Sequence, residues 1–230
     1  EFAGTLTVSG CRFERNVGLA GAVAVQVVQG GDFVFRSCEF NDNSGEVTGG
    51  AIAVGSAQQS TISIEDARFR RNSAGFGGAL SINSVNALNI TDCEFSENRA
   101  LAGRGGAING YRCLGVSVDR TTFQGNSAQD SGGAIYVADG DIRLVESELI
   151  NNEADNGGAI YAAGGIIAEG SGFYGNHATN DGGAVFAGTG FSGLDCELFG
   201  NNSGYWGGGL YSFHGHSVLE RCELFGNSAI

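Results

Sequence analysis

Proline, methionine and lysine are absent from the 230-residue chain, so all 12 basic residues are arginines. The 41 glycines follow no Gly-X-Y period, which excludes collagen. The chain has no run of about 18 apolar residues, the length that a membrane-spanning helix needs. Its hydrophobic content of 42% is too high for a disordered chain. The sequence therefore indicates a folded, glycine-rich protein with no membrane-spanning helix.

Positive charge is scarce as well. The 12 arginines stand against 25 acidic residues, which gives a formal net charge of −13. Nucleic acid binding requires a positive surface for the phosphates, so nucleic acid is excluded as a partner. An acidic surface of this kind remains suited to cations or to a basic partner.

Metal-ligand spacing is also missing. The six cysteines contain no Cys-X-X-Cys pair, and the three histidines, His177, His214 and His216, lie away from any cysteine cluster. Structural and catalytic zinc sites use such clusters. We therefore expect no metal site of this type and no cofactor.

A repeat of 24 to 29 residues runs through the whole chain. Its anchor is an apolar residue followed three positions later by asparagine. The anchor pairs are Phe13/Asn16, Phe40/Asn43, Phe69/Asn72, Phe95/Asn98, Phe123/Asn126, Leu149/Asn152, Phe173/Asn176, Leu198/Asn201 and Leu224/Asn227. Five to seven residues after the asparagine, most units continue with Gly-Gly-Ala and an aliphatic residue, as in Gly49-Gly50-Ala51-Ile52.

Each unit contains three short segments in which apolar residues alternate with polar ones. They lie before the anchor, at the anchor and after the glycine pair; Ile62 and Ile64 exemplify the first of them. Alternation of this kind predicts strands, and a single such unit cannot bury its own apolar face. The sequence thus predicts an all-β, right-handed parallel β-helix with three short strands per coil and about nine coils. No secretory signal opens the chain and no polar capping segment lies at either end, so we expect residues 1–230 to be one solenoid segment of a longer polypeptide; the alternative is that coils stack end to end between copies.

The asparagine column has a structural explanation. An inward asparagine at the same turn of every coil can donate its amide to one neighbour and accept from the other, which satisfies buried backbone groups. The glycine pair marks a bend that needs a positive φ angle or close approach of two backbones. We therefore assign a structural role to the nine asparagines.

The FxxN motif combined with GGA and an aliphatic residue resembles the repeat of the chlamydial polymorphic outer-membrane proteins. The resemblance covers essentially all 230 residues through the nine anchors and the glycine segments. It implies a right-handed β-helix of an autotransporter adhesin type. The membrane barrel found at the C-terminus of that family has no counterpart in this sequence.

Five of the six cysteines occupy the position two residues before the anchor. Other units have alanine, serine or threonine there, so the simplest interpretation is that each cysteine serves as a small inward side chain that packs in the core. Alternatively, Cys11 with Cys38 and Cys196 with Cys222 form disulfides between adjacent coils, since the coil spacing lies within the permitted Cα range. Cys113 is out of phase with this column.

Two glycosylation sequons occur. Asn89 lies between Leu88 and Ile90, which should point inward, so Asn89 should point outward and is the expected acceptor in a secreted protein. Asn201 belongs to the inward asparagine column and is a poor acceptor.

An aromatic stripe occupies the position after the first inward aliphatic residue of the glycine segment. In units five to eight this position holds Tyr136, Tyr161, Phe186 and Tyr211, and we expect these rings to face solvent. Such a stripe suits a protein interface or stacking on sugar rings. Alternatively, the rings stack on each other and stabilise neighbouring strands.

Three acidic residues, Asp130, Asp155 and Asp181, precede the glycine pairs of adjacent units. Carboxylates beside glycine-rich turns can hold Ca²⁺, but the Gly-Gly-X-Gly-X-Asp signature of calcium-binding β-rolls is absent. Solvated charge is the simpler interpretation, and calcium is the one cofactor that stays open.

Catalysis on this fold requires non-repeating residues in long loops. Glycoside hydrolysis needs two carboxylates at a fixed separation, and here the nearest local cluster is Asp139, Asp141 and Arg143 at a strand entry. We expect no enzyme. The prediction is an extracellular or cell-surface structural or adhesive β-solenoid in an appendage, filament or matrix, with other copies or other surface proteins as partners. The alternative is a carbohydrate-binding or polysaccharide-cleaving module that recognises glycans.

Overall fold

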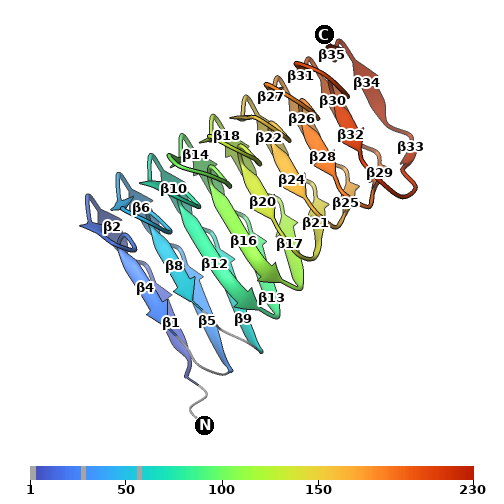
Figure 1. The fold of residues 1–230 in the computed structure, drawn as a ribbon. Coiled ribbons are helices and arrows are strands. Elements are labelled where there is room, and N and C mark those ends of the chain that lie inside the picture. The colour runs from blue at the N-terminus through green and yellow to red at the C-terminus, as the bar shows by residue number, and fades with distance from the viewer. Residues whose placement is uncertain (1–3, 27–29, 56–58) are drawn as a thin grey trace.

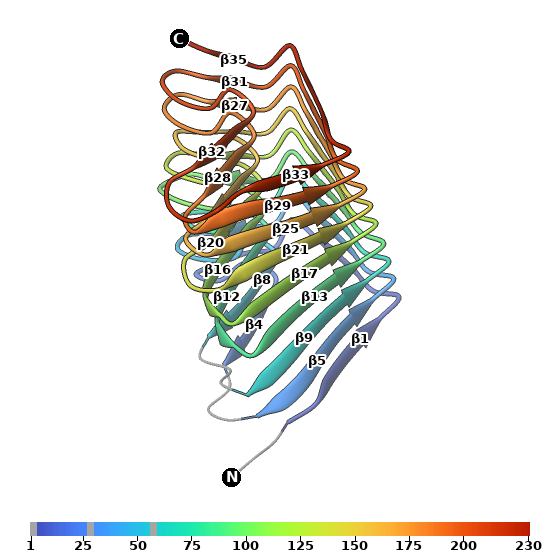
Figure 2. The ribbon, with the colours of Figure 1, turned by 90° about the vertical axis from the view of Figure 1, so that its right-hand side faces the viewer.

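The computed structural model describes residues 4–26, 30–55 and 59–230. The chain winds as a solenoid whose strands all pair in parallel with the equivalent strands of the coils before and after. Figure 1 shows the coils as successive rungs from the N-terminus to the C-terminus, and Figure 2 shows one sheet of the stack face on. The described part of the chain has no helix with the length and apolar character to span a bilayer. The all-β parallel solenoid expected from the repeat is confirmed.

Four parallel sheets, which we name A to D in chain order, form the walls of the solenoid. Sheet A comprises β1 (Leu6–Ser9), β5 (Gly31–Arg36), β9 (Ser60–Glu65), β13 (Ala87–Thr91), β17 (Gly115–Asp119), β21 (Asp141–Val145), β25 (Gly165–Glu169), β29 (Gly190–Leu194) and β33 (Val218–Glu220). Sheet B comprises β2 (Arg12–Glu14), β6 (Glu39–Asn41), β10 (Arg68–Arg70), β14 (Glu94–Ser96), β18 (Thr122–Gln124), β22 (Glu148–Ile150), β26 (Gly172–Tyr174), β30 (Glu197–Phe199) and β34 (Glu223–Phe225).

The remaining two sheets complete each coil. Sheet C comprises β3 (Val17–Gly18), β7 (Ser44–Gly45), β11 (Ser73–Ala74), β15 (Arg99–Ala100), β19 (Ser127–Ala128), β23 (Glu153–Ala154), β27 (His177–Ala178), β31 (Asn202–Ser203) and β35 (Ser228–Ala229). Sheet D comprises β4 (Val23–Gln26), β8 (Ile52–Gly55), β12 (Leu80–Val85), β16 (Ile108–Cys113), β20 (Ile135–Val137), β24 (Ile160–Ala162), β28 (Val185–Ala187) and β32 (Leu210–Ser212). The described residues therefore contain eight coils of four strands and three strands of a ninth.

The expectation of three strands per coil is wrong, because sheet C adds a fourth. Each strand of sheet C has two residues and directly follows the repeat asparagine. Two residues are too few to show an alternation of apolar and polar side chains. The inward residue of each two-residue strand is small, as Ala74 and Ala154 illustrate, so the backbone of sheet C lies close to the core.

The anchor residues form a column through the core. Phe40, Phe69, Phe95 and Phe123 are fully buried. The ring centroids of successive anchors from Phe13 to Phe123 lie 4.6 to 4.9 Å apart, and the rings are within 7° of parallel. This separation is the strand spacing of a sheet, so in-register pairing stacks identical side chains directly.

The repeat asparagines form a second column of linked side chains. Asn126, which is fully buried, accepts at Oδ1 from the N–H and the Nδ2 of Asn98, both at 3.0 Å. Its own Nδ2 donates to the carbonyl of Phe95 at 2.9 Å and to Oδ1 of Asn152 at 3.0 Å. The same pattern recurs at Asn43, Asn72, Asn98, Asn152, Asn176 and Asn201, and bonds of this set extend to the half-buried Asn227. Asn16 begins the column in an exposed position and donates to Asn43.

Both expectations for the glycine pair are confirmed, one for each glycine. The first glycine adopts a positive φ angle, 66° at Gly132. The second approaches the next coil so closely that a Cβ on Gly133 would lie 2.1 Å from the carbonyl oxygen of Gly158. The pair is thus required by backbone conformation and by backbone contact.

Candidate functional site

The aromatic stripe lies on the outer surface of sheet D. In β20, the flanking residues Ile135 and Val137 are fully buried in the core, which places Tyr136 between them on the other face. The register pairs Tyr136 with Tyr161, Tyr161 with Phe186 and Phe186 with Tyr211. In the four preceding coils the same column holds Ala24, Ala53, Ser81 and Asn109. The structure therefore brings together all four members of the stripe.

The rings of the stripe stack on one another. The centroids of Tyr136 and Tyr161 are 5.3 Å apart and those of Tyr161 and Phe186 are 4.5 Å apart, both with interplanar angles of 18°. Tyr211 continues the column at 5.2 Å from Phe186, but its ring is tilted by 59°. The faces of the inner rings are thereby occupied by neighbouring rings, which removes them as stacking partners for a sugar.

Tyr136 does not face solvent, contrary to the expectation for the stripe; its exposed fraction is 7%. One face packs on Tyr161, and the guanidinium of Arg104 lies over the ring at 4.9 Å from its centroid. Arg104 also donates from Nη1 to the Tyr136 hydroxyl at 2.8 Å and from Nε to Asp130 at 2.8 Å. Tyr136 is thus the core of a closed cation–π and hydrogen-bond cluster.

The titration of this cluster follows from its contacts. Burial raises the pKa of Tyr136, and the charge of Arg104 opposes that rise. Partial burial would also raise the pKa of Asp130, but hydrogen bonds from Arg104 and Ser131 outweigh it and hold the pKa below its ordinary value. The cluster therefore stays ionised as an Arg–Asp pair through the neutral pH range.

Further aromatic residues extend the stripe beyond its four predicted members. Trp206 stacks on Tyr211 at 5.8 Å, and Phe213 lies 6.4 Å from Phe186. Both side chains are more than half exposed, as is Tyr205. Trp206 is the single tryptophan of the chain and occupies the turn before the eighth glycine pair, so comparison of this turn between units would have found it.

The three aspartates proposed for calcium do not converge. Asp130 is paired with Arg104, Asp155 accepts from the Thr179 hydroxyl, and Asp181 accepts from the backbone N–H of Trp206. Within residues 4–26, 30–55 and 59–230, no three His, Cys, Asp or Glu side chains are placed to share a metal ion. Each carboxylate instead links its own coil to a neighbouring one, Asp130 to the coil before and Asp155 and Asp181 to the coil after.

All six cysteines are free thiols in this structure. Cys11 and Cys38 occupy equivalent places in adjacent coils, as do Cys196 and Cys222. Each of these thiols donates to the carbonyl two residues earlier, at 3.2 to 3.4 Å. The serines and threonine of the same column do likewise: Ser147 donates to the carbonyl of Val145 at 2.8 Å and accepts from the Thr121 N–H. A small side chain with one donor thus closes this corner in most coils.

The two sequon asparagines have different surroundings. Asn89 is half-buried on the outer surface of β13, between the buried Leu88 and Ile90. Asn201 is fully buried and donates to Phe173 and Asn227 through its side chain. A glycan on Asn201 would have to break the asparagine column.

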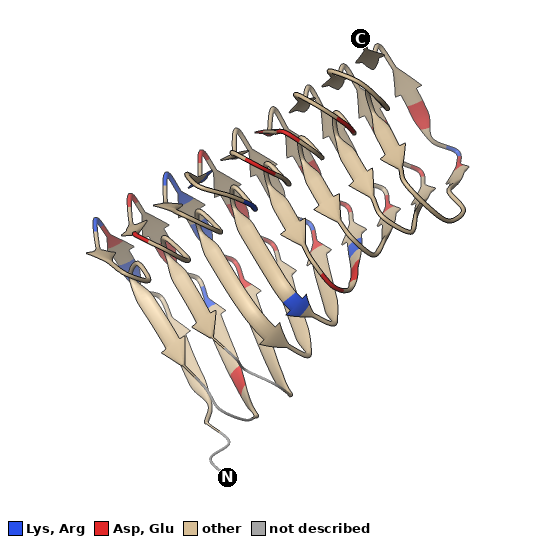
Figure 3. Ribbon diagram, in the orientation of Figure 1, with Lys and Arg blue, Asp and Glu red and all other residues tan. Residues whose placement is uncertain are grey.

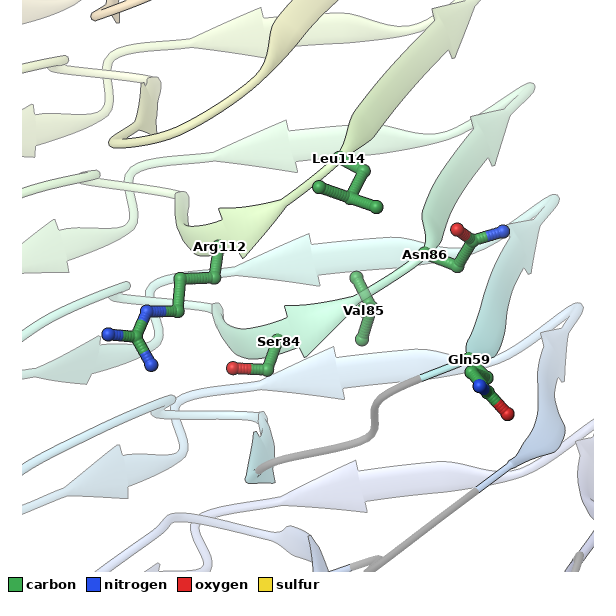
Figure 4. A pocket seen from close by; sticks show the side chains of 6 residues that line it. All are labelled: Gln59, Ser84, Val85, Asn86, Arg112 and Leu114. Carbon is green, nitrogen blue, oxygen red and sulfur yellow. The ribbon is translucent and has the colours of Figure 1, made fainter.

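The outer surface has several shallow hollows, one of which is shown in Figure 4. This hollow has a volume of about 280 Å³ and is lined by Gln59, Ser84, Val85, Asn86, Arg112 and Leu114. Two larger hollows of about 440 Å³ each meet on sheet C at Arg99 and Leu101. At the strand entry that holds Asp139, Asp141 and Arg143, Asp141 accepts from the Gly165 N–H at 2.7 Å and Arg143 pairs with Glu169 at 3.4 Å. That cluster links adjacent coils of sheet A.

Charge is divided unevenly along the solenoid (Figure 3). Residues 1–120 contain 12 acidic residues and ten arginines, a net charge of −2. Residues 121–220 contain 12 acidic residues and one arginine, a net charge of −11. In the N-terminal half, arginines pair with carboxylates of neighbouring coils, as Arg71 does with Asp42 at 2.7 Å. The C-terminal half is left strongly acidic.

Comparison with known proteins gives two family matches and one curated relative. Residues 2–116, half of the chain, match the family described as the right handed beta helix region. Residues 120–138, 146–163 and 173–188 match the Chlamydia polymorphic membrane protein repeat. Over 129 residues the chain is 31% identical to the probable autotransporter YfaL of Escherichia coli (strain K12), which covers 50% of this chain and 10% of that protein. The chain thus spans about a tenth of the length of this relative. No solved structure matches the chain.

Proposed function

Because the chain belongs to the right-handed β-helix family and carries the repeat of the Chlamydia polymorphic membrane proteins, we propose that it is an extended structural and adhesive solenoid exposed at a cell surface. The observation that carries this proposal is the regularity of the rod. Columns of anchor residues (phenylalanine or leucine), asparagines and glycines run through consecutive coils, which makes a stiff spacer about 40 Å long at a strand spacing near 4.8 Å.

The similarity to an autotransporter supports the surface location in this proposal. The stacked stripe supports the proposed structural role, because the rings of Tyr161 and Phe186 stack face to face on each other. We assign the stripe to the stability of the rod. An adhesive contact must then lie on surfaces whose side chains are not packed in this way.

The chemistry of the carboxylates favours a scaffold over a polysaccharide-cleaving enzyme. A general acid for glycoside cleavage needs a raised pKa. At Asp42, Asp92 and Asp195 the hydrogen bond from an arginine of a neighbouring coil holds the pKa below its ordinary value. These carboxylates serve as links between coils.

Surface exposure is tested with antibodies raised against the purified chain. Intact cells of the source organism should bind the antibody, and permeabilising the cells should add little signal. An antibody against a cytoplasmic protein is the control, since it should stain only permeabilised cells. Staining that requires permeabilisation would refute the proposed location.

The adhesive role is tested with beads that carry the purified chain. These beads should bind to cells or to extracellular matrix more strongly than beads that carry the unfolded, acid-treated chain. Release of reducing sugar ends from a panel of polysaccharides by the purified chain would instead favour the enzymatic alternative.

A further inference from the structure

Sheet B presents a different outer surface in its C-terminal half. We name as the acidic platform the outward residues of β22, β26 and β30, which are Glu148, Ile150, Gly172, Tyr174, Glu197 and Phe199. Their inward neighbours, Leu149, Phe173 and Leu198, are fully buried in the core. The platform is therefore backed by fully buried side chains of the core.

The centre of the acidic platform is an aromatic ring held in place by a glycine. Tyr174 folds back over Gly172, so that a Cβ on Gly172 would lie 2.3 Å from Cε2 of the ring. The Tyr174 hydroxyl donates to Glu197 at 2.8 Å. Burial and this bond to Glu197 raise the pKa of Tyr174 to about 12, so the ring remains a neutral phenol. The tyrosine is thus oriented in advance, flat over the sheet.

Carboxylates stand on both sides of this ring. Glu148 and Glu197 are in register with Gly172 in the coils before and after, which are the places next to the ring. Both glutamates are exposed. No arginine within the described residues pairs with either of them, and the single arginine of residues 121–220, Arg143, pairs with Glu169 on sheet A. The platform therefore carries unneutralised negative charge around an aromatic ring.

The N-terminal half of sheet B shows that this is not a general property of the repeat. There the same outward columns hold both signs, and they neutralise each other: Arg12 pairs with Glu14 at 3.0 Å and Arg68 with Glu94 at 3.8 Å. Glu94 occupies the column of Glu148, two coils earlier. The two halves thus differ in charge pairing while they share one backbone.

The chain itself shows what this combination of groups binds. In the stripe of sheet D, Arg104 lies over the ring of Tyr136 and pairs with Asp130, which combines a cation, an aromatic ring and a carboxylate. In the acidic platform the ring and the carboxylates are present without an arginine of the chain itself. Cation–π attraction and charge-assisted hydrogen bonds both favour a cationic side chain at such a place.

From these observations we propose that the acidic platform binds an arginine or lysine side chain of a basic, extended segment of a partner protein. Ile150 and Phe199, in register with Tyr174 in the coils before and after, provide half-buried apolar contacts for the residues that flank the cation. A second copy of this chain does not fit this description, because its own net charge of −13 repels the platform. The inference rests on the proposed adhesive function and gives its partner class.

The test uses fluorescence anisotropy with a fluorescein-labelled peptide of alternating arginine and valine, and a peptide of alternating glutamate and valine as the negative probe. The wild-type chain should bind the basic peptide and should not bind the acidic one. Loss of a cation–π contact of about 1 kcal/mol corresponds to about fivefold weaker binding, so Tyr174→Leu should weaken binding by about fivefold or more. Glu148→Gln should weaken it to a similar degree, and Tyr174→Phe, which keeps the ring, should weaken it less than Tyr174→Leu.

The matched control is Glu94→Gln, in the same column of the same sheet, where Arg68 already pairs with the carboxylate. This change removes the same charge from the chain and should alter the affinity less than twofold. An equal loss with Glu94→Gln and Glu148→Gln would show attraction by net charge alone and would overturn the inference. Failure of the basic peptide to bind the wild-type chain would also overturn it. Surface staining and bead adhesion that persist in that case would leave the proposed function intact and reject only the partner class.

Discussion

Truncation of one buried asparagine of the repeat column should destabilise the rod strongly. Asn126→Ala removes the acceptor of two donors on Asn98, its backbone N–H and its Nδ2, and removes the donor to the Phe95 carbonyl. Asn98 is fully buried, so water cannot replace these partners without opening the core. A buried polar group that loses its partner costs about 1 to 3 kcal/mol, and the two donors together with the carbonyl give an expected loss of about 3 to 5 kcal/mol.

The assay is urea unfolding followed by circular dichroism, with the slope of the transition recorded as well as its midpoint. Asn16→Ala is the matched control, since Asn16 lies in the same column but is exposed and accepts no bond from an earlier asparagine. It should cost less than about 1 kcal/mol. Equal effects of the two substitutions, or a loss below about 1 kcal/mol for Asn126→Ala, would refute the assignment of a structural role to the column.

Three further predictions concern single positions. Gly133→Ala should lower the free energy of unfolding by about 2 to 3 kcal/mol, because its Cβ would collide with the next coil, while Gly115→Ala, with open space around it, should change it by less than about 1 kcal/mol in the same urea assay. With Ellman's reagent at neutral pH the exposed Cys11 should react rapidly. Cys113 is fully buried and burial raises its pKa to about 12, so it should react only after unfolding. A count of fewer than six thiols in the unfolded, unreduced chain would show that disulfides exist. Tyr174 should ionise near pH 12, so the contribution of its neutral form to stability is complete below its ordinary pKa of 10.0 and is lost as the pH rises through 12. In a titration followed by phenolate absorbance, the Tyr174→Phe variant should lack a transition near pH 12 that the wild-type chain shows. If the variant instead lacks a transition near pH 10, the contact of Tyr174 with Glu197 is contradicted.

The architecture could be predicted from the sequence because the same motif recurs in nine successive units. In-register parallel pairing forces equivalent residues to meet, so the columns of Phe95 and Asn126 follow directly from the spacing of their motifs. Sheet C was missed for the opposite reason, since a two-residue strand such as β15 leaves no alternation to detect.

The candidate sites were less predictable, because they depend on the direction in which long side chains turn. The position of Tyr136 on the outer surface follows from alternation, but its burial comes from Arg104, a side chain 32 residues earlier that happens to reach across to the next coil. The fold of Tyr174 over Gly172 likewise requires knowledge that these two residues share the outer surface of one strand. A glycine in a column otherwise filled by charged and polar residues was the available signal.

The hydrogen bonds that join one asparagine side chain to the next all point one way along the rod. From Asn43 to Asn201, each Oδ1 accepts from the asparagine of the coil before, and each Nδ2 donates to Oδ1 of the asparagine in the next coil as well as to a carbonyl of the coil before. Asn126 therefore meets two donors and a carbonyl on the coil before it. Chain order and the order of these side-chain bonds coincide, so the two faces of a coil differ in what they present to a neighbour, and coils match one another only head to tail.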